Sequence, residues 1–127
     1  MGFFSKIFGT KKNAPWKTYY ENGQLRSIYM GGEGGELDGP FEFYHENGQL
    51  DQKGTRKYGK LHGPLKTYFE NGQLTSMGNF KDGEPHGPCE SYYENGQLMY
   101  KGTLHMGERC GEWTEDGKTV TYDPCPN

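Results

Sequence analysis

The chain has 127 residues, enough for one domain. Only 31% of them are apolar while 21 are glycine, so a compact fold with a large core is not expected, and an aromatic content of 15% argues against disorder. The net charge of −3 gives no basic footprint for nucleic acid and is compatible with a basic protein partner.

The first predicted element is an amphipathic segment at residues 1–13, a short helix or arm, whose apolar side chains would fall on one face of a helix. Such a short helix is marginal alone in water, so that face needs a partner. Three alternatives remain open: the arm caps the first hairpin, makes a peripheral contact with a membrane, or contacts a protein. The apolar residues of the arm are Phe3, Phe4, Ile7 and Phe8.

The chain shows no transmembrane stretch and no secretory signal. No segment reaches the roughly 20 apolar residues of a spanning helix. The apolar start is too short for a signal peptide and runs into Lys11 and Lys12. We therefore expect a cytoplasmic protein, with a peripheral position on the inner membrane face as the alternative.

A repeat follows the arm. The pentapeptide Glu-Asn-Gly-Gln-Leu begins at Glu21, Glu46, Glu70 and Glu94, so successive copies are 25, 24 and 24 residues apart. A fixed period of this size is typical of repeat proteins. We expect one repeat domain of about four and a half units at 14–122, followed by a tail at 123–127.

Each unit predicts two antiparallel strands. An aromatic and Thr-rich run leads into Asn-Gly, the signal for a type I′ hairpin turn, and a return run begins at Gln-Leu. A second turn rich in glycine closes the unit, as at Gly59–Gly63. The predicted fold is all-β, an extended meander of roughly nine or ten strands.

Strand alternation separates the side chains onto two faces. One face carries mainly aromatic, Leu, Thr and Ser side chains. The other carries one tyrosine per unit, preceded by a charged residue such as Glu42 or Glu90. The tyrosines are either core residues that send their hydroxyls to a turn or an exposed row for a protein partner. They are Tyr19, Tyr44, Tyr68 and Tyr92.

Glycines recur on the return strands, four residues after each repeat leucine, at Gly54, Gly78 and Gly102. A glycine there admits a neighbouring aromatic ring close to the backbone.

No catalytic residue, metal site or cofactor is predicted. His62 and His86 occupy equivalent turns about 9.6 Å apart, too far to share a metal, and each is expected to bond within its own turn. Cys89, Cys110 and Cys125 match no zinc pattern and suggest no disulfide framework. Cys89 is read as a buried apolar residue rather than a nucleophile.

The pattern Tyr-x-Glu-Asn-Gly-Gln-Leu, followed by a glycine turn ending in His-Gly-Pro, resembles the variant MORN repeat of bacteria. The clearest copy runs from Tyr68 to Pro88, and the resemblance extends from about Pro15 to Gly117. In the first unit Asp38 stands where His62 and His86 stand later. The resemblance implies an elongated hairpin array, and for small bacterial members it implies YwqK-type antitoxins or immunity proteins.

We therefore expect a non-enzymatic binding protein, an antitoxin or immunity protein that covers a cognate toxin with its tyrosine face and the neighbouring carboxylates. The alternative is a membrane-associated scaffold that uses the N-terminal arm. No nucleic-acid partner is expected.

Overall fold

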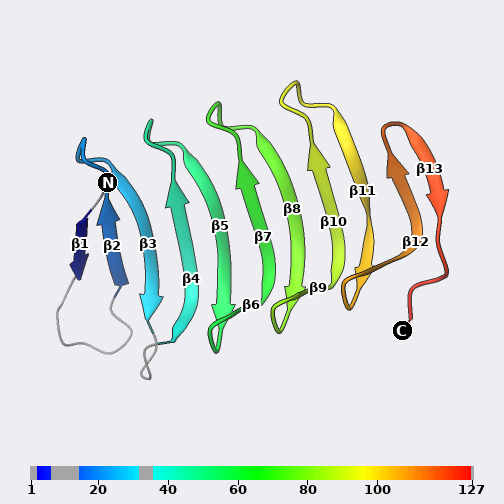
Figure 1. Cartoon of the computed structure of the whole chain (residues 1–127), viewed down its shortest axis with the longest axis horizontal. Coiled ribbons are helices and arrows are strands. Elements are labelled where there is room, and N and C mark those ends of the chain that lie inside the picture. Colours follow the sequence, from blue (N-terminus) through cyan, green and yellow to red (C-terminus); the bar gives the residue numbers. More distant parts are fainter. Residues whose placement is uncertain (1–2, 7–14, 32–35, 127) are drawn as a thin grey trace.

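The computed structural model describes residues 3–6, 15–31 and 36–126. Within these ranges thirteen strands form one antiparallel sheet, and none of these residues is helical. Figure 1 shows the strands side by side in chain order, with β1 at one end and β13 at the other. The predicted all-β meander is confirmed. It has more strands than expected because two short strands continue the turns and the arm adds another.

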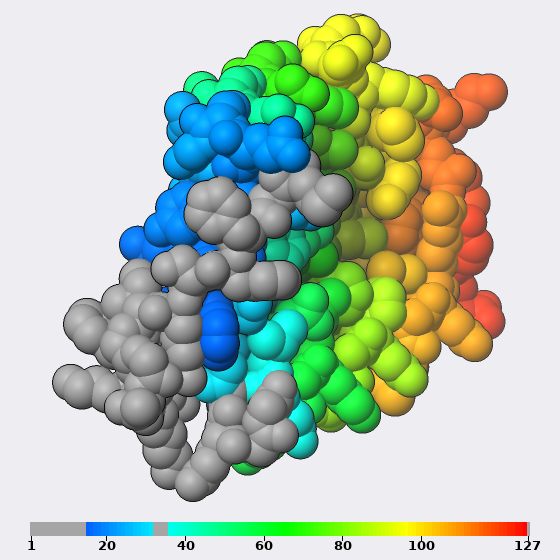
Figure 2. Space-filling view, turned by 60° about the vertical axis from the view of Figure 1, so that its left-hand side comes forward, coloured from blue at the N-terminus to red at the C-terminus, as the bar shows by residue number. Residues whose placement is uncertain are grey.

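The strands are bounded as follows: β1 Phe3–Lys6, β2 Pro15–Tyr19, β3 Leu25–Gly31, β4 Leu37–Tyr44, β5 Leu50–Lys57, β6 Lys60–Leu61, β7 Gly63–Tyr68, β8 Leu74–Lys81, β9 Glu84–Pro85, β10 Gly87–Tyr92, β11 Leu98–His105, β12 Glu108–Glu115 and β13 Lys118–Thr121. Each strand pairs with the next one along the chain, except that β6 pairs only with β5 and β9 only with β8. The main sheet therefore continues from β5 to β7 and from β8 to β10. Figure 2 shows the units following one another across the surface from the N-terminus to the C-terminus.

The N-terminal segment, expected to be a short helix or an arm, is not helical at Phe3–Lys6. Phe3–Lys6 is strand β1 and pairs with β2, Phe3 opposite Tyr19 and Lys6 opposite Trp16. Pairing supplies backbone partners to a strand that would otherwise be a bare sheet edge, whereas a short helix gains little in water. Ile7 and Phe8 lie outside the described residues.

The pentapeptide forms a hairpin of a different type from the one predicted. Gly23 has φ of 87°, but Asn22 is absent from the positive-φ residues of the described chain, so the turn is not type I′. Gly23 N–H donates to the Tyr20 carbonyl at 3.0 Å, and Tyr20 N–H donates to the Gln24 carbonyl at 2.9 Å. These bonds define a type I turn followed by a left-handed glycine, with Glu21 as the additional loop residue.

Type I′ turns occupy the opposite edge of the sheet. At three turns on that edge both turn residues have positive φ: Tyr58-Gly59 between β5 and β6, Asp82-Gly83 between β8 and β9, and Met106-Gly107 between β11 and β12. A fourth turn of this type, Asp116-Gly117, joins β12 to β13 at the pentapeptide edge. Aspartate tolerates this conformation, whereas tyrosine and methionine rarely adopt it. Tyr58 and Met106 are 74% and 58% exposed.

The core lies on the aromatic face of the sheet. Phe41 and Trp113 are 3% and 1% exposed. A Cβ on Gly102 would lie 2.1 Å from the Trp113 ring, and one on Gly54 would lie 2.9 Å from Phe41. At Gly78 the nearest atom is an ordinary 3.6 Å away. The predicted close approach of a ring is therefore confirmed at two of the three glycines.

Hydroxyl pairs continue the core toward the pentapeptide edge. Thr18 and Ser27 lie opposite each other on β2 and β3 and are both buried, with their side-chain oxygens 2.5 Å apart. Thr67 and Ser76 repeat this pair two units later at 2.6 Å. The bonds satisfy polar groups that would otherwise be costly to bury.

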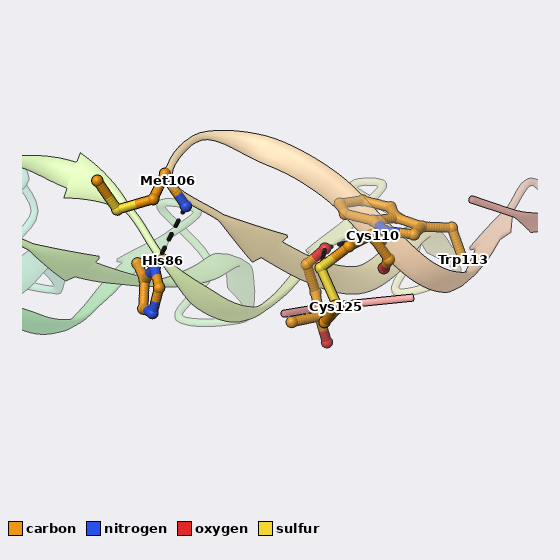
Figure 3. Close-up of a disulfide and its surroundings, with 6 residues drawn as sticks. His86, Met106, Cys110, Trp113 and Cys125 are labelled. Carbon is orange, nitrogen blue, oxygen red and sulfur yellow. Dashed lines mark hydrogen bonds between the residues drawn. A yellow bond between two sulfur atoms is a disulfide. The ribbon is translucent and has the colours of Figure 1, made fainter. Parts of the chain in front are cut away.

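The C-terminal end is closed by a disulfide, which contradicts the expectation of unpaired cysteines. Gly111 N–H donates to the Asp123 carbonyl, and Tyr122 N–H donates to the Gly111 carbonyl, both at 2.8 Å. The tail thus runs back along β12 and brings Cys125 to Cys110, to which it is bonded. Figure 3 shows the disulfide beside the indole of Trp113, which caps the last unit.

Candidate functional site

The face opposite the core repeats a three-residue pattern, which we call the Pro–Tyr face. In every unit it presents a proline, a charged residue and a tyrosine at alternate positions of the opening strand. Because alternate residues of a strand point the same way, all three lie on one side of the sheet. Its members are Pro15, Lys17 and Tyr19; Pro40, Glu42 and Tyr44; Pro64, Lys66 and Tyr68; and Pro88, Glu90 and Tyr92.

All four predicted tyrosines are half-buried, so they are neither fully buried core residues nor a fully exposed row. The Tyr44 hydroxyl donates to Glu42 Oε1 at 2.6 Å, and the Tyr92 hydroxyl donates to Glu90 Oε2 at 2.8 Å. The structure therefore brings both predicted carboxylates to tyrosines of their own strands, and neither of these hydroxyls reaches a turn. In the units of Tyr19 and Tyr68 a lysine takes the place of the carboxylate.

The carboxylates also change the acidity of these tyrosines. The hydrogen bond to Glu42, followed by burial, raises the pKa of Tyr44 to about 12. The hydrogen bond to Glu90 raises the pKa of Tyr92 as well. Losing the phenolic proton would break the bond and leave two negative charges together, so the proton is held more tightly.

Hydrogen bonds between units hold the tyrosine strands in place. The Tyr20 hydroxyl donates to the Tyr44 carbonyl at 2.5 Å, and His45 Nε2 bonds to the Tyr68 carbonyl at 2.9 Å. In these two units the side chain just before the pentapeptide thereby ties its own unit to the next tyrosine, whereas the third unit has Phe69 at this position and cannot form the bond. A rigid backbone at these points fixes the spacing of the rings.

Two shallow hollows adjoin one another on the Pro–Tyr face. The first, of about 320 Å³, is lined mainly by apolar side chains from β3 and β4, and we call it the apolar hollow. The second, of about 240 Å³, lies over β5 between β4 and β7, and we call it the lysine hollow. They share Pro40 and Lys53. The apolar hollow is lined by Ile28, Met30, Pro40, Phe41, Glu42 and Lys53, and the lysine hollow by Pro40, Lys53, Gly54, Thr55, Pro64, Lys66 and Tyr68.

Sequence reasoning did not identify Lys53. It stands on a return strand at a position filled by Ile28, Met77 and Lys101 in the other units, so the repeat does not mark it. It lies directly opposite Lys66 in the sheet. The sequence places Lys53 opposite Lys66 only if the strand register is known, and the register depends on the type of both turns.

The histidine at the second turn connects neighbouring units, contrary to the prediction that it bonds within its own turn. Met106 N–H donates to His86 Nδ1 at 3.2 Å (Figure 3), and Tyr58 N–H donates to Asp38 Oδ1 at 3.1 Å. In both cases the acceptor supports a type I′ turn 20 residues further on. At His62 the Nδ1 atom is buried without a hydrogen-bond partner.

The described residues hold no group of three His, Cys, Asp or Glu side chains placed to share a metal ion. Cys89 is half-buried and free, and burial raises the pKa of its thiol, which disfavours the nucleophilic thiolate. The pentapeptide carboxylates are exposed at intervals along one edge of the sheet: Glu21, Glu46, Glu70 and Glu94. No helix in the described ranges is long and apolar enough to span a membrane.

Comparison with known proteins supports the repeat assignment. The chain matches the MORN repeat variant model at residues 12–30, 37–58, 61–82 and 85–105. No curated protein matches it.

Two solved structures are similar to this chain over a part of their own length. One is accessory secretory protein 1, 2 and 3 of Streptococcus pneumoniae (16% identity, TM-score 0.31, covering 89% of this chain and 19% of that one). The other is TarM (11% identity, TM-score 0.40, covering 93% and 21%). The chain thus spans about a fifth of either structure. The four matched segments cover most of the chain, which therefore belongs to the MORN repeat variant family.

Proposed function

We propose that this chain is a non-enzymatic binding protein whose Pro–Tyr face covers a protein partner, and that the partner is a toxin neutralised by an antitoxin or immunity mechanism. Membership of a repeat family suggests a binding or repeat-type protein. We choose this face because two of its tyrosines form hydrogen bonds to carboxylates. Tyr44 and Tyr92 are each held by a carboxylate two residues upstream while remaining half-buried.

Such rings are suited to anchor a partner. An aromatic side chain supplies a large contact area, and a ring already held in one orientation loses little conformational entropy on binding. The inter-unit bonds to the backbone of Tyr44 and Tyr68 fix the spacing of the row. A partner that covers several rings would meet a preorganised surface.

Neutralisation would follow from occlusion. The described part of the Pro–Tyr face is broad and carries two shallow hollows, so we expect it to act by covering an active site or locking a conformation of the toxin. In this proposal Tyr19, Tyr44, Tyr68 and Tyr92 supply the contact area. Glu42 and Glu90 orient two of the rings and contribute charge at their margins.

The test takes the protein encoded by the gene next to this one in the native host as the candidate toxin. Host cells that express that neighbour alone should stop growing, and co-expression of the full chain should restore growth. The double variant Tyr44→Ala/Tyr68→Ala should lose protection, because truncating two anchors typically weakens binding by about 30-fold or more.

The matched control is Tyr58→Asn, which removes an exposed tyrosine from the opposite edge of the sheet and should protect fully. Expression and far-ultraviolet circular dichroism should be the same for all variants. Full protection by the double variant would exclude the Pro–Tyr face as the neutralising surface.

The membrane-scaffold alternative relied on a helical stripe in the arm. Phe3–Lys6 forms a strand on β2, so that part of the stripe does not exist in the fold. Co-sedimentation with liposomes that is lost on deleting residues 1–12 would restore the alternative. The proposed location remains cytoplasmic, a reducing compartment in which the Cys110–Cys125 bond would be open to reduction.

A further inference from the structure

A single row of side chains crosses the middle of the Pro–Tyr face from strand to strand. Cross-strand pairing places its members directly opposite one another, in the order Lys17, Ile28, Glu42, Lys53, Lys66, Met77, Glu90 and Lys101. Four lysines against two glutamates give this row a net charge of +2, although the whole chain carries −3. The face that is proposed to bind is thus positive along its centre.

The positive charge is concentrated at one cross-strand pair. Lys53 and Lys66 lie directly opposite each other on β5 and β7. Directly opposed side chains have Cβ atoms only about 4.5–5.5 Å apart, and like charges at that distance destabilise the sheet. Two ammonium groups placed together on an exposed face favour the arrival of an anion.

Carboxylates of the chain compensate this pair only in part. Glu42 Oε2 lies 4.0 Å from Lys53 Nζ, and the other oxygen of Glu42 already accepts the Tyr44 hydroxyl. Lys66 has no carboxylate partner in the described part of the chain. The Lys53 side chain remains 60% exposed. The pair therefore keeps the capacity to bind a further carboxylate.

The surroundings specify more than charge. The lysine hollow is lined by both lysines together with Pro40, Pro64 and Tyr68. The apolar hollow adjoins it through Pro40, with Ile28 and Met30 on its far side. Ile28 and Met30 lie on β3 and Lys53 on β5, two strand spacings or roughly 10 Å away.

We propose that these hollows together bind an acidic polypeptide segment of the partner, one that places an apolar side chain against Ile28 and Met30 and a carboxylate between Lys53 and Lys66. This inference rests on the proposed binding function and names the chemistry of the partner. It reverses the expectation from overall charge, because both glutamates of the face accept tyrosine hydroxyls, while Lys53 has only Glu42 at 4.0 Å and Lys66 has no carboxylate partner among the described residues.

A polypeptide fits this row better than a nucleic acid. Glu42 and Glu90 lie on either side of the lysine pair, within about 19 Å of one another at roughly 4.8 Å per strand. A continuous run of phosphates crossing the sheet would meet both carboxylates. A protein segment can place single carboxylates at the lysines and neutral or apolar groups elsewhere.

The experiment measures the binding of defined probes to the full chain by fluorescence anisotropy. The main probe is a labelled peptide made of repeats of Gly-Leu-Glu-Glu-Ser. Companion peptides replace every Glu by Lys or every Leu by Ser, and a labelled oligothymidylate represents nucleic acid. The acidic peptide should bind, more weakly as salt is raised, whereas the basic peptide should not. The peptide without leucine should bind less tightly.

Charge reversal tests the site directly. Lys53→Glu/Lys66→Glu should weaken binding of the acidic peptide by about tenfold or more, and Lys53→Gln/Lys66→Gln should weaken it less. Lys81→Glu/Lys118→Glu carries the same net change at exposed positions outside the hollows and should bind like the unaltered chain.

Three results would overturn the inference: no binding of the acidic peptide, equal loss in the two charge-reversed variants, or binding of oligothymidylate that is as tight and equally sensitive to Lys53 and Lys66. The outcome is separable from the growth test. If Tyr44→Ala/Tyr68→Ala abolishes protection while the acidic peptide fails to bind, the binding function stands and the acidic partner is wrong.

Discussion

Gly102 should be the glycine on the core face that tolerates alanine least. A Cβ at this position would lie 2.1, 2.3 and 2.5 Å from three atoms of the Trp113 ring. The ring is 1% exposed, its Nε1–H donates to the carbonyls of Thr103 and Cys110 at 3.1 Å, and the Arg109 guanidinium lies 4.3 Å from its centroid. It therefore has little room to retreat.

The expected loss follows from what the ring must do. If Trp113 shifts within the core, overpacking lowers the free energy of unfolding by about 1–3 kcal/mol. If it is expelled, the loss approaches about 3–5 kcal/mol, the range for removing a large aromatic side chain from a core. Urea denaturation followed by circular dichroism and tryptophan fluorescence measures this loss as a lower midpoint with an unchanged slope.

Equivalent positions in the other units provide controls. At Gly78 the nearest atom to an added Cβ is 3.6 Å away, so Gly78→Ala should be neutral or stabilising by about 0.5 kcal/mol. Gly54→Ala should fall between, with contacts of 2.8 Å to Leu65 and 2.9 Å to Phe41. If Gly102→Ala and Gly78→Ala differed by less than about 0.5 kcal/mol, Trp113 would not lie over Gly102.

Three other predictions concern the end, the turns and the tyrosines. Cys125→Ser should lower the free energy of unfolding by about 3 kcal/mol, measured by urea denaturation without reductant, because it removes a disulfide with a sequence separation of 15. An unchanged free energy of unfolding would argue against the disulfide. Tyr58→Asn and Met106→Asn should each stabilise by about 1 kcal/mol in thermal melts, since asparagine tolerates the positive φ; destabilisation would contradict the turn assignment. Phenolate absorbance should show Tyr44 titrating with a pKa of about 12, and the Glu42→Gln variant should bring this pKa nearer its ordinary value. Because the pKa of Tyr44 is raised in the folded state, the stability that this hydrogen bond contributes is complete below pH about 10 and is lost as the pH rises toward 12.

Local chemistry and the repeat period together account for the sheet. The period, the Asn-Gly turns and strand alternation correctly predict the hairpins, the two faces and the close approach of aromatic rings to the backbone at Gly54 and Gly102. They do not predict the turn type, because Asn-Gly also fits a turn in which only the glycine has positive φ. In the structure Asn22 Oδ1 accepts the Gln24 N–H at 2.9 Å, which stabilises that alternative.

Features that depend on contacts outside the repeat could not be predicted. The disulfide requires the tail to run back along β12, and no motif marks that path. The strand at Phe3–Lys6 forms because β2 offers an unpaired edge, which outweighs a local helical pattern. The Lys53–Lys66 pair depends on the register of two strands whose return-strand positions do not repeat.

The central claim is that the Pro–Tyr face is the binding surface, and calorimetric titration with the purified partner tests it most directly. The account predicts that Tyr44→Ala/Tyr68→Ala weakens the affinity by about 30-fold or more, whereas Tyr58→Asn leaves it unchanged. Equal affinities for the double variant and the unaltered chain, with both folded, would contradict it.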